Sequence, residues 1–132
     1  MKKQVEDWIL LADRDLQAAE ILIKDPSPLT NIVAFLCQQS IEKYLKAFLI
    51  ENDVPLIKTH DLVKLNKLIK NIEDLGFDKE KLILINEIYS ESRYPSELGL
   101  TANGMPTNEQ VETFIAYAKE VKIIIITELN KL

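Results

Sequence analysis

Residues 38–47, with the sequence QQSIEKYLKA, decide how the rest of this chain is interpreted. They lie in the middle of a segment, from about Leu29 to Glu51, that contains neither glycine nor proline. At about 100° per residue, the apolar side chains of the expected helix gather on one arc. These residues are Val33, Cys37, Ile41, Tyr44, Ala47 and Phe48. The spacing predicts that this apolar arc packs in the core.

The opposite arc of the same helix is polar. It consists of Gln38, Gln39, Glu42, Lys43 and Lys46. Glu42 and Lys46 have the i,i+4 spacing of a helical ion pair, and the two glutamine amides can bond a partner helix or a base edge. Three uses of this polar arc remain open: packing or dimer contacts, a ligand groove, or plain solvation.

The composition fits one ordinary globular domain over residues 1–132. Apolar residues make up 47% and charged residues 28% of the chain, and there are only three glycines and five prolines, which favours a few long elements. The net charge of −5 argues against broad non-specific binding to nucleic acid, so any RNA contact has to be local. Cys37, the single cysteine, cannot form an internal disulfide and is expected to be a buried apolar residue.

No targeting or membrane segment is expected. The N-terminus passes from Lys2 and Lys3 straight to acidic residues, without the apolar region of a signal peptide. The longest aliphatic run, residues 123–126, is too short to cross a bilayer. We therefore expect a cytoplasmic protein with no membrane partner.

Helical spacing recurs before and after the central helix. A first helix is expected from Val5 to Ile23, and the prolines of residues 25–28 separate it from the second, which predicts an antiparallel pair. In such a pair, Asp15 can reach Lys43 or Lys46.

Three further helices follow the central one. Thr59 is expected to cap the third, with Asp61 in its first turn, an apolar face that reaches Ile72, and Gly76 at its close. Asp78 caps the fourth, which Pro95 ends, and a loop over residues 96–106 follows. The fifth begins with a capping box of Thr107 and Gln110. The fold class is therefore all-α, an up-and-down bundle of four or five helices.

Four motifs along the chain carry a resemblance to a known family. They are ADRDL at residues 12–16, QQSIEKYLKA at 38–47, KTHDL at 58–62 and YSESRYP at 89–95. In this order, over nearly the whole chain, they resemble the HEPN family (higher eukaryotes and prokaryotes nucleotide-binding domains). The resemblance implies a helical bundle that pairs as a homodimer. It also implies a minimal nucleotidyltransferase partner, with some such pairs acting as toxin and antitoxin.

Many HEPN toxins are metal-independent RNases that use an arginine followed within a few residues by histidine. Arg93 matches that arginine, but residues 94–100 contain no histidine, and His60 is the only one in the chain. We therefore predict a non-catalytic component that binds a nucleotide or a nucleotidyltransferase partner. The alternatives are a divergent RNase toxin that uses Arg93 and Tyr94, and a purely structural interaction module.

The residues expected to bind a nucleotide or form an interface come from the motifs. They are Gln38, Gln39, Glu42, Lys43, Lys46, His60, Arg93 and Tyr94. His60 is expected in the first helical turn beside the Thr59 cap, used either for packing or for contact with a nucleotide. A lone histidine without companion ligands makes no metal site, so neither a metal nor another cofactor is expected.

Overall fold

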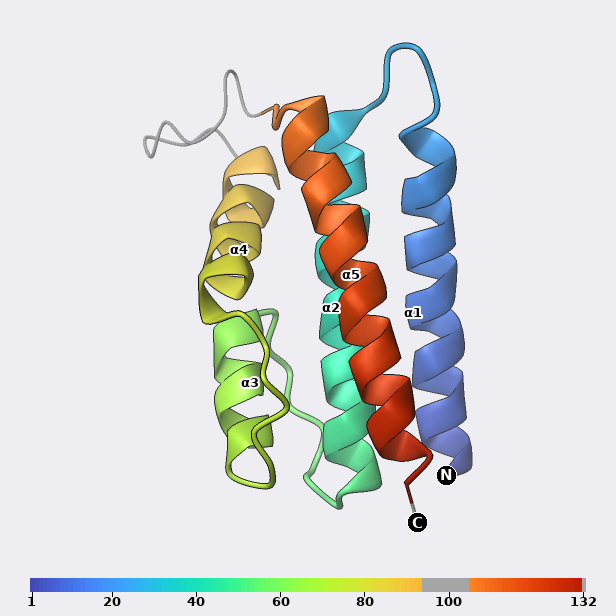
Figure 1. Cartoon of the computed structure of the whole chain (residues 1–132), viewed down its shortest axis with the longest axis vertical. Helices are drawn as coiled ribbons and strands as arrows, with labels where there is room; N and C mark the ends of the chain where they lie inside the picture. The colour runs from blue at the N-terminus through green and yellow to red at the C-terminus, as the bar shows by residue number, and fades with distance from the viewer. Residues whose placement is uncertain (94–104, 132) are drawn as a thin grey trace.

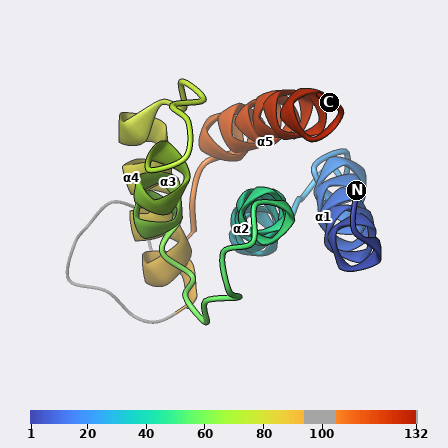
Figure 2. The ribbon, with the colours of Figure 1, turned by 90° about the horizontal axis from the view of Figure 1, so that it is seen from below.

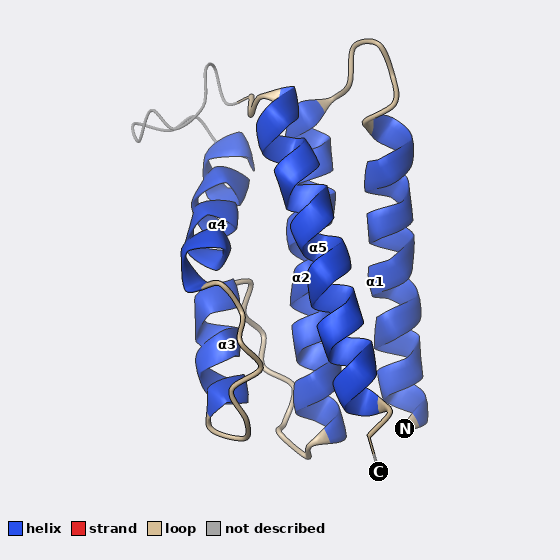
Figure 3. Cartoon of the chain, in the orientation of Figure 1, coloured by secondary structure: helices blue, strands red, loops and turns tan. Residues whose placement is uncertain are grey.

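The computed structural model describes residues 1–93 and 105–131, and for residues 91–93 the backbone alone. Within these residues, five helices form a bundle (Figure 1, Figure 3). They are α1 (Lys3–Leu22), α2 (Thr30–Glu51), α3 (Leu62–Lys70), α4 (Lys79–Arg93) and α5 (Asn108–Leu129). The predicted all-α bundle is confirmed.

Helix α2 is the centre of the bundle. Seen along its axis, it is surrounded by α1 on one side, α5 on another and the α3–α4 pair on a third (Figure 2). It makes contacts with all four other helices. Of its 22 residues, 15 are buried, which is more than one apolar stripe can account for. The bundle is therefore organised around α2 on nearly every face.

The apolar arc of α2 packs in the core as its spacing predicts. All of its members are less than 5% exposed: Val33, Cys37, Ile41, Tyr44, Ala47 and Phe48. Residues from α1 and α5 at helical spacing complete this core, among them Leu16, Phe114 and Ile125. Trp8 is half-buried and packs against the core from α1.

Polar side chains fix the register of α1 against α2. The Ser40 hydroxyl donates a hydrogen bond of 3.0 Å to the carbonyl oxygen of Ala12. Lys43 forms an ion pair with Asp15, so one of the two expected partners of Asp15 is confirmed. The Tyr44 hydroxyl bonds the Asp13 carboxylate. These bonds hold the antiparallel pair at one relative height along the helix axes.

The chain reverses after α2 and runs back beside it. Asp53 takes a positive φ of 64° at the reversal, a conformation that aspartate tolerates better than most residues. The connection then returns along α2 as far as the level of Gln38, whose amide bonds the carbonyl of His60. Only there does α3 begin, and it runs down again before α4 turns upward (Figure 1).

The expectations about both ends of α3 are wrong. Its N-cap is Asp61 and not Thr59: the Asp61 carboxylate accepts bonds from the backbone N–H groups of Val63 and Lys64. The Thr59 hydroxyl instead accepts a bond of 3.2 Å from the Asp61 N–H. The helix also ends at Lys70, before Ile72. The helix is therefore capped by a carboxylate and not by the expected threonine hydroxyl.

Gly76 does not close α3 but lies in the connection to α4, where its φ is 78°. The two other predicted caps are confirmed. The Asp78 carboxylate accepts bonds from Glu80 and Lys81 at the start of α4, and Thr107 and Gln110 form a reciprocal capping box on α5. Most of the loop expected over residues 96–106 lies outside the described residues.

The capping box gives the first prediction. Replacing Thr107→Ala removes the oxygen that accepts the Gln110 N–H at 3.1 Å, and we expect a loss of about 1 kcal/mol in the free energy of unfolding. Urea denaturation followed by circular dichroism measures this loss. Thr107→Ser keeps the hydroxyl and is the matched control. Equal stability of the alanine and serine variants would contradict the assigned cap.

Candidate functional site

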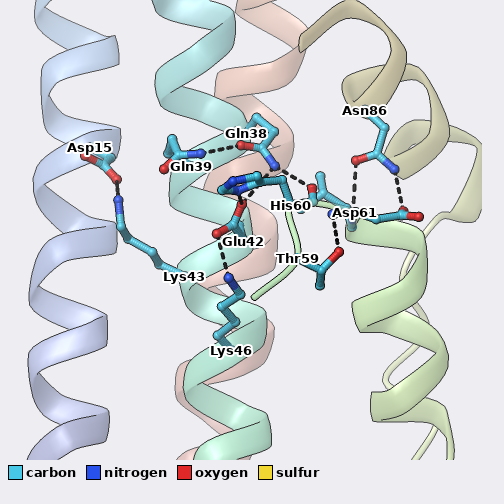
Figure 4. Close-up of polar contacts among 11 residues, drawn as sticks. Asp15, Gln38, Gln39, Glu42, Lys43, Lys46, Thr59, His60, Asp61 and Asn86 are labelled. Carbon is cyan, nitrogen blue, oxygen red and sulfur yellow. Dashed lines mark hydrogen bonds and ion pairs between the residues drawn. The ribbon is translucent and has the colours of Figure 1, made fainter. Parts of the chain in front are cut away.

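The polar arc of α2 is largely buried inside the chain. Gln38, Glu42 and Lys46 are 0%, 4% and 6% exposed, because the returning connection covers them (Figure 4). Plain solvation is therefore excluded as the use of these three side chains. Gln39 and Lys43, on the side nearer α1, are half-buried.

The Glu42 carboxylate lies at the centre of this arc. One oxygen, Oε2, accepts a bond of 2.8 Å from the Lys46 ammonium. The other, Oε1, lies 2.8 Å from Nδ1 of His60 and 3.2 Å from the Gln38 amide nitrogen. The Glu42 and Lys46 side chains are only 5% and 7% exposed. Each charge is thus matched by the other in a region that water hardly reaches.

Gln38 links the carboxylate to the connection that covers it. Its amide nitrogen donates to Glu42 and also, at 2.8 Å, to the backbone carbonyl of His60. Its amide oxygen accepts a bond of 2.7 Å from Gln39. This buried amide is therefore satisfied on both sides. We call Gln38, Gln39, Glu42, Lys46 and His60 the Glu42 network.

His60 was expected in the first turn of α3. It lies instead in the extended connection before that helix. Its side chain is 65% exposed although Nδ1 contacts the buried Glu42. The ring also lies beside that of Tyr89 from α4, with 6.4 Å between the centroids. His60 therefore joins α2 to α4 and presents the rest of its ring to the surface.

Asn86 has a role that the sequence did not reveal. Its side-chain nitrogen donates a hydrogen bond of 2.9 Å to the Asp61 carboxylate. Its side-chain oxygen accepts a hydrogen bond of 3.0 Å from the Leu62 N–H. This clamp ties the start of α3 to α4 next to the Glu42 network (Figure 4). The only signal in the sequence was a polar residue among the apolar positions Leu82, Ile85 and Ile88 of α4.

A pocket of about 340 Å³ opens beside the network. It is lined by Trp8, Lys46, Leu56, Ile57, Lys58, Thr59 and His60. The Lys46 ammonium lies 5.9 Å from the centre of the Trp8 ring. The helical spacing of Trp8 fits the apolar face of α1 and by itself favours a core position. That spacing could not show that the returning connection forms a pocket against it.

The remaining predicted site residues are Arg93 and Tyr94. Helix α4 ends at Arg93. The Arg93 side chain and the whole of Tyr94 lie outside the described part of the chain. Within residues 1–90 and 105–131, no group of three or more potential ligands could hold a metal ion.

Cys37 and Tyr44, on the apolar arc of α2 opposite the network, are held in their protonated forms. Burial raises the pKa of the Cys37 thiol to about 12, with a smaller contribution from the negative charge of Glu20. Burial first, and then the bond to Asp13, raise the pKa of the Tyr44 phenol well above its ordinary value. Thiolate chemistry at Cys37 is therefore disfavoured near neutral pH.

Comparison with known proteins accords with this arrangement. The model of the HEPN domain matches residues 5–128 of the chain. This chain belongs to the HEPN family. Among curated proteins, no significant match is found. None of the described helices is both long and apolar enough to span a membrane.

Two solved structures share the HEPN fold seen here. ST0689, an archaeal HEPN homologue, is 23% identical and superposes with a TM-score of 0.74, covering 98% of this chain and 100% of its own. TT1696 from Thermus thermophilus is 18% identical with a TM-score of 0.78, covering 96% of this chain and 98% of its own. At these identities the likeness concerns the fold.

The Glu42 network gives the second prediction for this HEPN domain. Replacing Glu42→Gln leaves the Lys46 ammonium buried without its counter-charge, and we expect a loss of about 3–5 kcal/mol in the free energy of unfolding. Chemical denaturation measures it. Adding Lys46→Met to Glu42→Gln should recover most of the loss, because the unpaired charge is then gone.

Asp7→Asn is the control for this prediction. It breaks the ion pair of Lys3 and Asp7, whose side chains are 81% and 58% exposed, and should cost less than about 1 kcal/mol. A similar small cost for Glu42→Gln would show that the burial of the pair has no energetic consequence.

Proposed function

We propose that this HEPN domain is a non-catalytic, cytoplasmic, homodimeric component of a two-component system of the toxin–antitoxin kind. It binds a nucleotide, or the minimal nucleotidyltransferase that carries one. The proposal rests on one observation: the polar side chains of the α2 motif bond to each other and to His60 inside the chain. Glu42, the central acid of that motif, is bonded by Gln38, Lys46 and His60 and is 5% exposed.

This use of the motif favours binding over catalysis. General acid–base catalysis requires a group within hydrogen-bond reach of the substrate, whereas the Glu42 carboxylate is covered by the connection before α3. The only histidine in the chain is bonded to that same carboxylate. No histidine follows Arg93 to complete the RNase pair of the family.

The test is expression and calorimetry. We expect no growth arrest when the protein is produced in a bacterial host, and measurable binding when purified protein is titrated with ATP, GTP and short RNA. Production together with the minimal nucleotidyltransferase encoded nearest to it should give a complex that co-purifies. Growth arrest that Arg93→Ala relieves would instead establish the RNase alternative and overturn the proposal.

Exposed apolar residues on α1 support the homodimer. Leu10 and Ile21 are 54% and 62% exposed. They stand eleven residues apart, which is close to three helical turns, so both face the same side of α1. Helix α1 lies at the edge of the bundle, where a second copy has access to it (Figure 2). Arg14 and Gln17 lie between Leu10 and Ile21 on this side of α1, so in the proposed dimer a second copy packs on two separate apolar side chains and not on a continuous apolar face.

We predict that the double variant Leu10→Glu and Ile21→Glu converts a dimer to a monomer, because charges cannot be buried at an apolar interface without partners. Light scattering after size exclusion measures the mass. Ile123→Glu, at a residue of α5 that is 66% exposed, is the control and should leave the dimer intact. A dimer that survives the double variant would place the interface elsewhere.

A further inference from the structure

The pocket between Trp8 and residues 56–60 has apolar walls. Trp8 lies on the α1 side, and Leu56 and Ile57 lie in the connection. Leu56 is 48% exposed and Trp8 is half-buried, so part of each apolar surface remains open to a ligand. Flat aromatic bodies bury much area against such walls, with an added gain from stacking on an aromatic ring.

The charges around the pocket favour an anion. None of its seven lining residues is acidic, although the chain has 21 acidic residues against 16 lysines and arginines. Lys46 forms an ion pair with Glu42, so its charge is already balanced within the chain. Lys58 is exposed and adds a positive charge at the rim, and the ring of His60 and the hydroxyl of Thr59 add hydrogen-bonding groups.

The Glu42 network gives this pocket a fixed wall. Gln38 bonds the His60 carbonyl at 2.8 Å, and the imidazole is bonded to Glu42. Lys46 is shared between the network and the pocket and lies 5.9 Å from the centre of the Trp8 ring. The connection that carries Lys58 is therefore anchored beside Trp8 before any ligand arrives, which lowers the entropy lost on binding.

From this juxtaposition we propose that the pocket binds a single nucleoside monophosphate. Its base packs against Trp8, Leu56 and Ile57, and its phosphate is held by Lys58 and His60. A volume of about 340 Å³ lies near the small end of ligand pockets, which suits one nucleotide and not a strand. This site assignment rests on the proposed function, since it locates the nucleotide binding that the function requires.

Trp8 is the only tryptophan in the chain, so its fluorescence reports on this pocket directly. Titration with AMP should change the emission in a saturable way. Adenosine, which lacks the phosphate, and inorganic phosphate, which lacks the base, should each bind at least about tenfold more weakly, since each loses one set of contacts. Equal affinity for AMP and adenosine would overturn the assignment of the phosphate to Lys58 and His60.

Lys58→Ala is the variant that tests the rim. It should weaken AMP binding about tenfold, because a charge-assisted bond to the phosphate is lost. Lys64→Ala is the control: Lys64 is an exposed lysine of α3 that does not line the pocket, so this variant makes the same change of net charge without removing a contact. Equal weakening by both variants would mean that only overall charge matters, and it would overturn the site.

The outcomes separate the pocket from the wider proposal. Calorimetry that detects AMP binding while Trp8 emission stays constant and Lys58→Ala binds normally overturns the pocket and leaves nucleotide binding intact. Absence of binding to any nucleotide overturns the pocket as well. The proposed partnership is then judged separately, by co-purification with the nucleotidyltransferase.

Discussion

The buried ion pair between Glu42 and Lys46 is the constraint on which the rest of this domain depends. Two charges removed from water are tolerated only when the remaining hydrogen-bonding capacity is also filled. Gln38 and His60 fill it, and His60 belongs to a different part of the chain. The pair therefore requires the connection after α2 to return and cover it. That return also sets where α3 begins and how α4 meets α2.

Much of the bundle could be predicted because it follows from local spacing. The apolar arc of α2, the antiparallel pairing with α1, the bond between Asp15 and Lys43, and the caps at Asp78 and Thr107 all depend on residues close in sequence or on one helix contact. Helix periodicity and the short proline connection contain this information.

The path of residues 52–61 could not be predicted in the same way. The use of the polar arc of α2 stayed open, because helical periodicity describes one helix and not the segment that covers it. Thr59 was expected to cap α3, but the Asp61 carboxylate accepts the bonds from Val63 and Lys64 and is held by Asn86 of α4, a contact that spacing along the chain cannot show. Trp8 likewise fits a core position by spacing, while its place at a pocket depends on a segment about fifty residues away.

The short α3 has a consequence for how this domain opens. At nine residues, it is below the length of about 12–15 residues at which an isolated helix holds together in water. It depends on its buried face and on the Asn86 clamp. Its backbone amides should therefore exchange with solvent through a local opening that leaves α1, α2 and α5 folded. Because residues 56–60 lead directly into α3, hydrogen exchange there reports on how firmly the wall beside Trp8 is held.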